Sequence, residues 1–207
     1  MTGAYRKFFG LMERDVKVAL ELGSRDGIDA IRIADHFGAE VVTWECNPEA
    51  LGLCRARLAN REDVELVELA AWSESKILPF FPVVNGNLGA SSAFRANHDY
   101  PYEKPYEQIV IEVEASRVDA WWEANRAGVP IDLLAMDLQG AELEALKGMG
   151  DLLDSVSYII TEGQHQRLYH DTPLISDIEA FLVERGFRLV KGLPANSWFG
   201  DFLFSKD

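Results

Sequence analysis

The sequence has few cysteines, few basic residues and no long apolar run, and each shortage narrows what the protein can be. Its two cysteines, Cys46 and Cys54, have no metal-ligand spacing, so we expect reduced thiols in a cytoplasmic protein and no metal centre. No apolar run reaches the roughly 18 residues that span a bilayer. Residues 1–11 lack the charged-then-apolar arrangement of a signal peptide. We therefore expect neither membrane association nor export.

Basic residues are outnumbered by acidic ones. The chain has 20 Lys and Arg against 34 Asp and Glu, which gives a net charge of −14. Affinity for nucleic acid comes largely from contacts of Lys and Arg with phosphates. The negative charge of this chain would repel the phosphates of a nucleic-acid partner. We expect no nucleic-acid partner and favour a small neutral one.

Alternating strand and helix patterns predict one α/β domain over residues 1–207, with parallel pairing and right-handed crossovers. Strands are predicted over residues 16–22, 40–45, 64–70, 109–114, 131–137, 156–162, 187–190 and 198–204, the last two as an antiparallel pair. Helices are predicted over residues 27–37 and 117–127, after Asn47-Pro48, after Gly140, and after a capping box of Ser176 and Glu179. A short helical lead-in is expected within residues 1–15.

A glycine-containing loop joins the first strand to the first helix. Gly23 and Gly27 allow positive φ and a close approach of backbone to ligand, and the helix that follows favours an anion at its start. Glu21 would repel a pyrophosphate and suits a cationic ligand instead. The spacing Glu-x-Gly-x-x-x-Gly lacks the middle glycine of the dinucleotide fingerprint. It resembles the first motif of class I S-adenosylmethionine-dependent methyltransferases, although a glycine turn of any α/β protein is the alternative.

Four predicted core strands run into a carboxylate, and ligands of parallel sheets bind at the carboxyl ends of the strands. These residues are Glu21, Glu45, Asp137 and Glu162. Glu45 lies at the end of the second strand, where its two oxygens could accept from both hydroxyls of a ribose. Both S-adenosylmethionine and NAD carry that ribose. The adenine is then expected near residues 69–72, with Trp72 as a stacking face or a core residue.

Residues 73–107 interrupt the alternation with prolines and aromatic residues. These are Pro79, Pro82, Pro101, Pro105, Phe80, Phe81, Phe94, Tyr100, Tyr102 and Tyr106. Long loops inside compact domains are more often functional than idle. We expect a lid or acceptor-binding insertion, with a surface excursion around its own aromatic cluster as the alternative. Exposed aromatic side chains here would suit a homodimer contact.

The segment from Asp137 to Gly148 resembles the FkbM-type methyltransferases. The matching positions are Asp137, Gly140, Glu142, Leu146, Lys147 and Gly148, and further landmarks are Ala90-Ser-Ser92, Val118-Asp119 and Trp198-Phe-Gly-Asp201. The resemblance implies a Rossmann-like class I methyltransferase fold, with a seven-stranded mostly parallel sheet, helices on both faces and an antiparallel last strand. This chain departs from the family at Ala135, where Lys is common, and at Gln139, where Glu is frequent.

The resemblance further implies transfer of a methyl group from S-adenosylmethionine to a hydroxyl of a sugar or small natural product. The residues expected around the cofactor are Glu21, Gly23, Ser24, Arg25, Gly27, Glu45, Ala71 and Asp137. A hydroxyl acceptor loses its proton, so a base is needed, and the candidates are Asp137, Glu162 and His165. Asp137 could also anchor a ligand or a metal ion, and His165 could simply be a solvated loop residue.

Three other functions remain open at this point. A methyltransferase acting on RNA or protein would share the fold, although the acidic charge argues against RNA. A nicotinamide-dependent oxidoreductase would share Glu45 but needs a glycine loop that this chain lacks. A non-catalytic binding domain would bind the cofactor without turnover.

Overall fold

The computed structural model describes residues 5–99 and 105–206, and its central element is a seven-stranded sheet. In spatial order the strands are β3 (Val64–Val67), β2 (Glu40–Trp44), β1 (Val18–Leu22), β7 (Leu133–Met136), β8 (Tyr158–Gln164), β10 (Phe199–Ser205) and β9 (Arg188–Pro194). Neighbouring strands are parallel except that β10 runs antiparallel to both β8 and β9. This arrangement confirms the predicted fold class.

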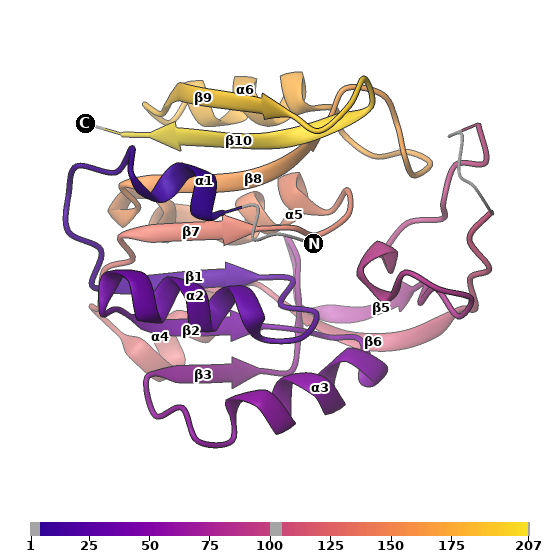
Figure 1. Cartoon of the computed structure of the whole chain (residues 1–207), viewed down its shortest axis with the longest axis horizontal. Helices are drawn as coiled ribbons and strands as arrows, with labels where there is room; N and C mark the ends of the chain where they lie inside the picture. Colours follow the sequence, from indigo (N-terminus) through magenta and orange to yellow (C-terminus); the bar gives the residue numbers. More distant parts are fainter. Residues whose placement is uncertain (1–4, 100–104, 207) are drawn as a thin grey trace.

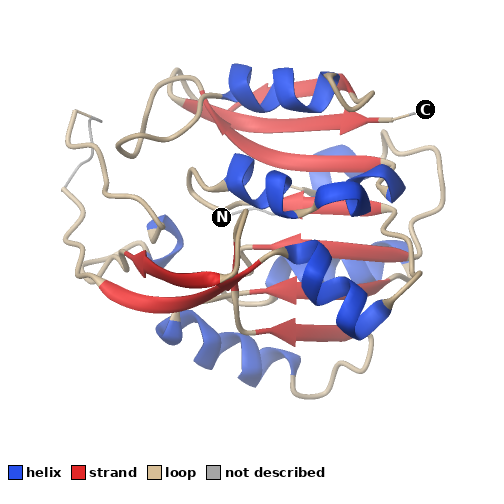
Figure 2. Ribbon diagram, turned by 180° about the vertical axis from the view of Figure 1, so that it is seen from behind, coloured by secondary structure: helices blue, strands red, loops and turns tan. Residues whose placement is uncertain are grey.

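Helices cover both faces of the sheet (Figures 1 and 2). One face carries α1 (Arg6–Phe9), α2 (Ile28–Phe37) and α3 (Pro48–Leu58), and the other carries α4 (Val118–Arg126), α5 (Glu142–Gly148) and α6 (Ile175–Val183). Because successive strand side chains point to opposite faces, β1 supplies Ala19 to the first core and Leu20 and Leu22 to the second. No helix in the described part of the chain is long and apolar enough to cross a membrane.

A second, three-stranded sheet lies beyond the carboxyl ends of the parallel strands (Figure 1). Its order is β4 (Ala70–Ala71), β6 (Ile111–Ser116) and β5 (Lys76–Phe80). The prediction of one strand over 64–70 was therefore wrong, because the chain leaves the main sheet after Val67. The prediction that 73–107 lacks strands was also wrong. Pro79 lies in β5, which tolerates it because β5 is an edge strand.

The aromatic side chains of the 73–107 segment turn inward. Phe80 and Phe81 are buried, and Phe94 and Tyr106 are half-buried. Tyr100, Pro101 and Tyr102 lie outside the described residues. The described part of this segment therefore has no exposed aromatic side chain that would support the expected homodimer contact. Its exposed large apolar residues are instead Ile77 and Val84.

Local signals set most helix ends correctly. Gly27 and Gly38 flank α2 with positive φ, and the Asn47 side chain accepts a hydrogen bond from the Glu49 amide at the start of α3. The capping box predicted at Ser176 was wrong, because α6 begins at Ile175 and the Leu174 amide donates to Asp177 instead. A one-turn 3₁₀ helix, η1 (Leu88–Ala90), and a longer one, η2 (Gly150–Ser155), complete the elements.

Candidate functional site

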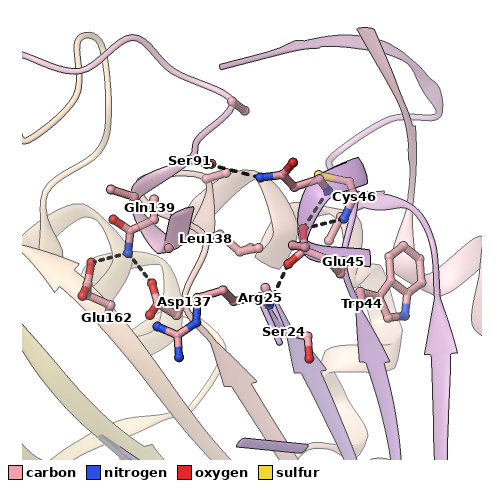
Figure 3. A pocket seen from close by; sticks show the side chains of 18 of the residues that line it. Ser24, Arg25, Trp44, Glu45, Cys46, Ser91, Asp137, Leu138, Gln139 and Glu162 are labelled. Atoms are coloured by element: carbon pink, nitrogen blue, oxygen red, sulfur yellow. Dashed lines mark hydrogen bonds between the residues drawn. The ribbon is translucent and has the colours of Figure 1, made fainter. Parts of the chain in front are cut away.

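A cavity of about 440 Å³ opens at the carboxyl ends of the parallel strands, where the small sheet faces them. Figure 3 shows side chains from several elements converging on it. The predicted residues that line it are Glu21, Gly23, Ser24, Arg25, Glu45, Ala71, Asp137 and Glu162. Leu69 to Trp72, where adenine was expected, also line it. The structure does not bring Gly27 or His165 to the cavity wall.

Gly23 lets the loop after β1 pack directly on the loop after β7. It has φ +89°, and a Cβ built there would lie 2.1 Å from the Asp137 carbonyl oxygen. The Gly23 amide donates to the Trp44 carbonyl over 3.0 Å, and the Asp137 amide donates to the Leu22 carbonyl over 3.1 Å. Only glycine fits this position. Gly27 instead begins α2 at φ +76° and packs against Leu58.

Glu21 is a buried acid at the cavity wall, hydrogen-bonded by the Thr43 hydroxyl. Burial raises the pKa of Glu21 to about 8, and the Thr43 hydrogen bond opposes the rise. A cation entering the cavity would stabilise the charged form. Nearby, the Ser24 hydroxyl is buried and finds no hydrogen-bond partner within the described residues, so it is available to a bound ligand.

Glu45 ties the loop after β1 to the loop after β2. Its Oε2 accepts from the Arg25 amide at 2.7 Å, and its Oε1 accepts from the amides of Cys46 at 2.8 Å and Asn47 at 2.7 Å. Burial raises the pKa of Glu45 while these backbone donors oppose the rise. A carboxylate offers about four lone-pair sites. Oε2 therefore has one lone-pair site left for a ligand hydroxyl. From the sequence, each of the two oxygens was expected to accept from one ribose hydroxyl.

Gln139 joins Asp137, the residue that follows β7, to Glu162, which lies within β8. Its Nε2 donates to Asp137 and, over 3.1 Å, to Glu162 Oε1 (Figure 3). Its Oε1 accepts from the Tyr169 hydroxyl at 2.6 Å, and its carbonyl accepts from the Ser92 hydroxyl at 2.8 Å. The side-chain amide thus connects the two acids to Tyr169, and the backbone carbonyl of the same residue connects to the 73–107 segment. Sequence reasoning noted Gln139 only as a departure from the family.

The acids of this network have raised pKa values. Burial raises the pKa of Asp137 to about 6, with the Gln139 hydrogen bond opposing it, and burial and the Asp137 charge raise that of Glu162. Near neutral pH the pair can therefore exchange a proton with a ligand. Within the described residues, no three His, Cys, Asp or Glu side chains are arranged to hold a metal ion.

Glu142 of the family motif has a local structural role. It is buried and accepts hydrogen bonds from the amides of Leu138 at 2.9 Å and Gly140 at 3.0 Å. These bonds fix the turn that carries Gln139, whose φ of +53° is unusual for a residue with a side chain. Glu142 therefore shapes the site without lining it.

His165 lies on the other side of β8 from Glu162. It follows the last residue of β8 and contacts Phe202, which lies on the opposite face of β10 from Asp201, the partner of Glu162. His165 is exposed, and its ring packs edge-on against Phe202 with centroids 5.7 Å apart. Its backbone amide donates to the Trp198 carbonyl at 2.6 Å. Of the three predicted bases, only Asp137 and Glu162 reach the cavity.

Sequence reasoning missed residues that reach the cavity from distant segments. These are chiefly Tyr5, Lys7, Asn47, Leu88, Tyr169 and Asp201. Asp201 lies directly opposite Glu162 in the antiparallel β8–β10 pair. Its place in Trp198-Phe-Gly-Asp201 and the expected pairing of the last strand could have identified it. No comparable signal marked Tyr5.

Comparisons with known proteins agree with this geometry. Residues 22–189 match the model of the methyltransferase FkbM domain. The chain is 31% identical over 174 residues to the 2-O-methyltransferase NoeI of Sinorhizobium fredii, covering 80% of this chain and 70% of that protein.

Solved structures of methyltransferases share the fold. TrmK of M. capricolum, in complex with S-adenosyl-homocysteine, matches with TM-score 0.57 at 7% identity, covering 100% of this chain and 69% of that one. Magnesium protoporphyrin IX methyltransferase of Synechocystis, with S-adenosylmethionine bound, matches with TM-score 0.52 at 13% identity, covering 93% and 70%. At these identities the likeness concerns the fold alone.

Proposed function

Since the chain belongs to the FkbM methyltransferase family and uses S-adenosylmethionine as its cofactor, we propose that it methylates a hydroxyl of a sugar or small natural product. The observation that carries this proposal is the Asp137–Gln139–Glu162 network beside the Gly23 loop in one cavity. A proton acceptor and a nucleoside-binding loop share one wall. The earlier nicotinamide alternative does not survive the family assignment.

The cavity residues fit the cofactor. Gly23 brings the loop after β1 directly against the Asp137 backbone, the buried Ser24 hydroxyl is unused, and Glu45 Oε2 keeps a lone-pair site. We assign Glu45 to the ribose hydroxyls and residues 69–72 to the adenine. Glu21, buried beside Thr43, would face the positive methionine end. When bound, the cofactor supplies an electrophilic methyl group on a sulfonium.

The protein's own part in the reaction is to align the acceptor and take its proton. Methyl transfer from a sulfonium is an in-line displacement, so alignment supplies much of the rate. We assign the proton to Asp137, because a pKa of about 6 leaves it charged at neutral pH yet able to accept a proton. Glu162, with its pKa raised further by the Asp137 charge, would be its protonated neighbour.

Three observations favour a sugar-like acceptor. The cavity lining combines the carboxylates of Asp137 and Glu162 with the rings of Tyr106 and Phe199, which suit hydroxyls and the apolar face of a sugar. The relative NoeI is a 2-O-methyltransferase. The net charge of −14 disfavours RNA. The same cavity could admit a protein side chain, which makes protein the alternative to test.

The test measures transfer of a radiolabelled methyl group from S-adenosylmethionine to three acceptor sets: a panel of methyl glycosides, bulk tRNA and a mixed protein substrate. We expect label on at least one glycoside, as a base-stable methyl ether, and none with Asp137→Asn. Label on tRNA or protein alone would overturn the acceptor proposal. A product lost on mild base treatment would be an ester and would overturn hydroxyl methylation.

A further inference from the structure

Tyr5 reaches the cavity from a segment that the family match does not include. The match covers residues 22–189, whereas Tyr5 lies before β1 and lines the cavity together with Lys7. Only 5% of Tyr5 is exposed. A buried polar side chain at a ligand cavity, placed there by a segment outside the family domain, calls for its own explanation.

The segment around Tyr5 is held firmly against the sheet. Phe8 and Phe9 of α1 are buried in the core with α2, and Phe9 packs on Phe37 with ring centroids 4.9 Å apart. Further on, the Tyr158 hydroxyl of β8 accepts hydrogen bonds from two backbone amides, those of residues 13 and 14, at 2.9 and 3.1 Å. In Figure 1, α1 lies against the same face as α2. The position of Tyr5 is therefore fixed by packing.

The Tyr5 hydroxyl makes no hydrogen bond with any residue that the structure describes. Burial, followed by the charges of Asp137, Glu21, Asp29 and Asp201, raises the pKa of the phenol well above its ordinary value. The phenol therefore keeps its proton and acts as a hydrogen-bond donor. Since no acceptor for it lies within residues 5–99 and 105–206, the phenol is available to a bound molecule.

The methionine end of the cofactor carries an ammonium and a carboxylate. Glu21, Asp29 and Asp137 suit the ammonium, but they repel the carboxylate, which needs donors. We propose that the Tyr5 hydroxyl donates a hydrogen bond to the methionine carboxylate of S-adenosylmethionine. The N-terminal segment thereby completes the cofactor site. This inference rests on the cofactor of the proposed function and not on the proposed acceptor.

Two ligands and two matched variants test the inference by titration calorimetry. S-adenosylhomocysteine has the methionine end, whereas 5′-methylthioadenosine lacks it and keeps the nucleoside. Tyr5→Phe removes one hydroxyl and keeps the ring. Ser205→Ala removes a buried hydroxyl of β10 that does not line the cavity and has no hydrogen-bond partner within the described residues, and it serves as the control.

We expect Tyr5→Phe to weaken the binding of S-adenosylhomocysteine about tenfold or more, because a hydrogen bond to a charged group is lost. The affinity for 5′-methylthioadenosine should not change. Ser205→Ala should change neither affinity. Equal weakening of both ligands by Tyr5→Phe, or no change in either, would overturn the inference. None of these measurements needs an acceptor, so failure of hydroxyl methylation would leave the result intact.

Discussion

Replacing Gly23 by alanine tests whether the contact between the two loops builds the cofactor site. The matched control is Gly38→Ala. Both glycines have positive φ, +89° and +65°, but a Cβ at Gly38 meets nothing within 4 Å, whereas one at Gly23 lies 2.1 Å from the Asp137 carbonyl oxygen. The pair therefore separates the cost of the backbone conformation from the cost of the close approach.

The control should cost about 1–2 kcal/mol, the penalty of a left-handed conformation for a residue with a Cβ. For a chain of this length that lowers Tm by roughly 2–8 °C. Gly23→Ala carries the same penalty plus an overlap between backbone-fixed atoms, which no side-chain rotation relieves. The loop has to move, which stretches the hydrogen bonds from Gly23 to Trp44 and from Asp137 to Leu22.

Thermal unfolding and titration with S-adenosylhomocysteine measure the two effects. We expect Gly23→Ala to lower Tm at least twice as far as Gly38→Ala does and to weaken the binding of S-adenosylhomocysteine more than tenfold. Gly38→Ala should bind this ligand with wild-type affinity. An equal Tm loss in the two variants, together with unchanged binding by Gly23→Ala, would refute the reasoning.

Three further substitutions test individual acids. Glu45→Ala should weaken S-adenosylhomocysteine by at least about 1.5–3 kcal/mol, and unchanged affinity by calorimetry would remove Glu45 from the ribose site. Asp137→Asn should lower kcat for methyl transfer to a glycoside acceptor far more than it lowers the affinity for the cofactor. Equal losses in kcat and affinity would make Asp137 a binding residue. Because the folded-state pKa of Glu21 is about 8, above its ordinary 4.5, Glu21 makes the free energy of unfolding fall as pH rises between these values. Glu21→Gln should flatten that trend in Tm, and an unaltered slope would contradict the burial argument.

The main sheet was predictable because its strands carry strong local signals. Apolar runs such as the one before Glu21 and the one before Asp137 end in polar loops, and glycines such as Gly38 mark helix ends. The small sheet escaped prediction because its pairing is tertiary: Ala70 and Ala71 become a strand only beside β6. Pro79 argued against a strand, yet an edge position has no ladder bond to lose there.

The strand-end acids of the site were predictable for the same reason, since parallel topology gathers them at one edge. Tyr5 and Tyr169 were not, because no spacing links residues so far apart in the chain to that edge. His165 shows the limit of sequence proximity. It lies only three residues from Glu162, but it follows the end of β8 and packs against Phe202, on the face opposite Glu162.

The two walls of the cavity come from two different sheets. The wall at the strand ends depends on the register of the main sheet, so a change there disturbs the central core. The facing wall comes largely from residues 69–107 and the small sheet, which has its own apolar cluster around Leu78, Phe80 and Val113. Gln139 and the Ala96–Tyr169 bridge are among the contacts that join the two. A substitution confined to the facing wall therefore reshapes the cavity without altering the register of the main sheet.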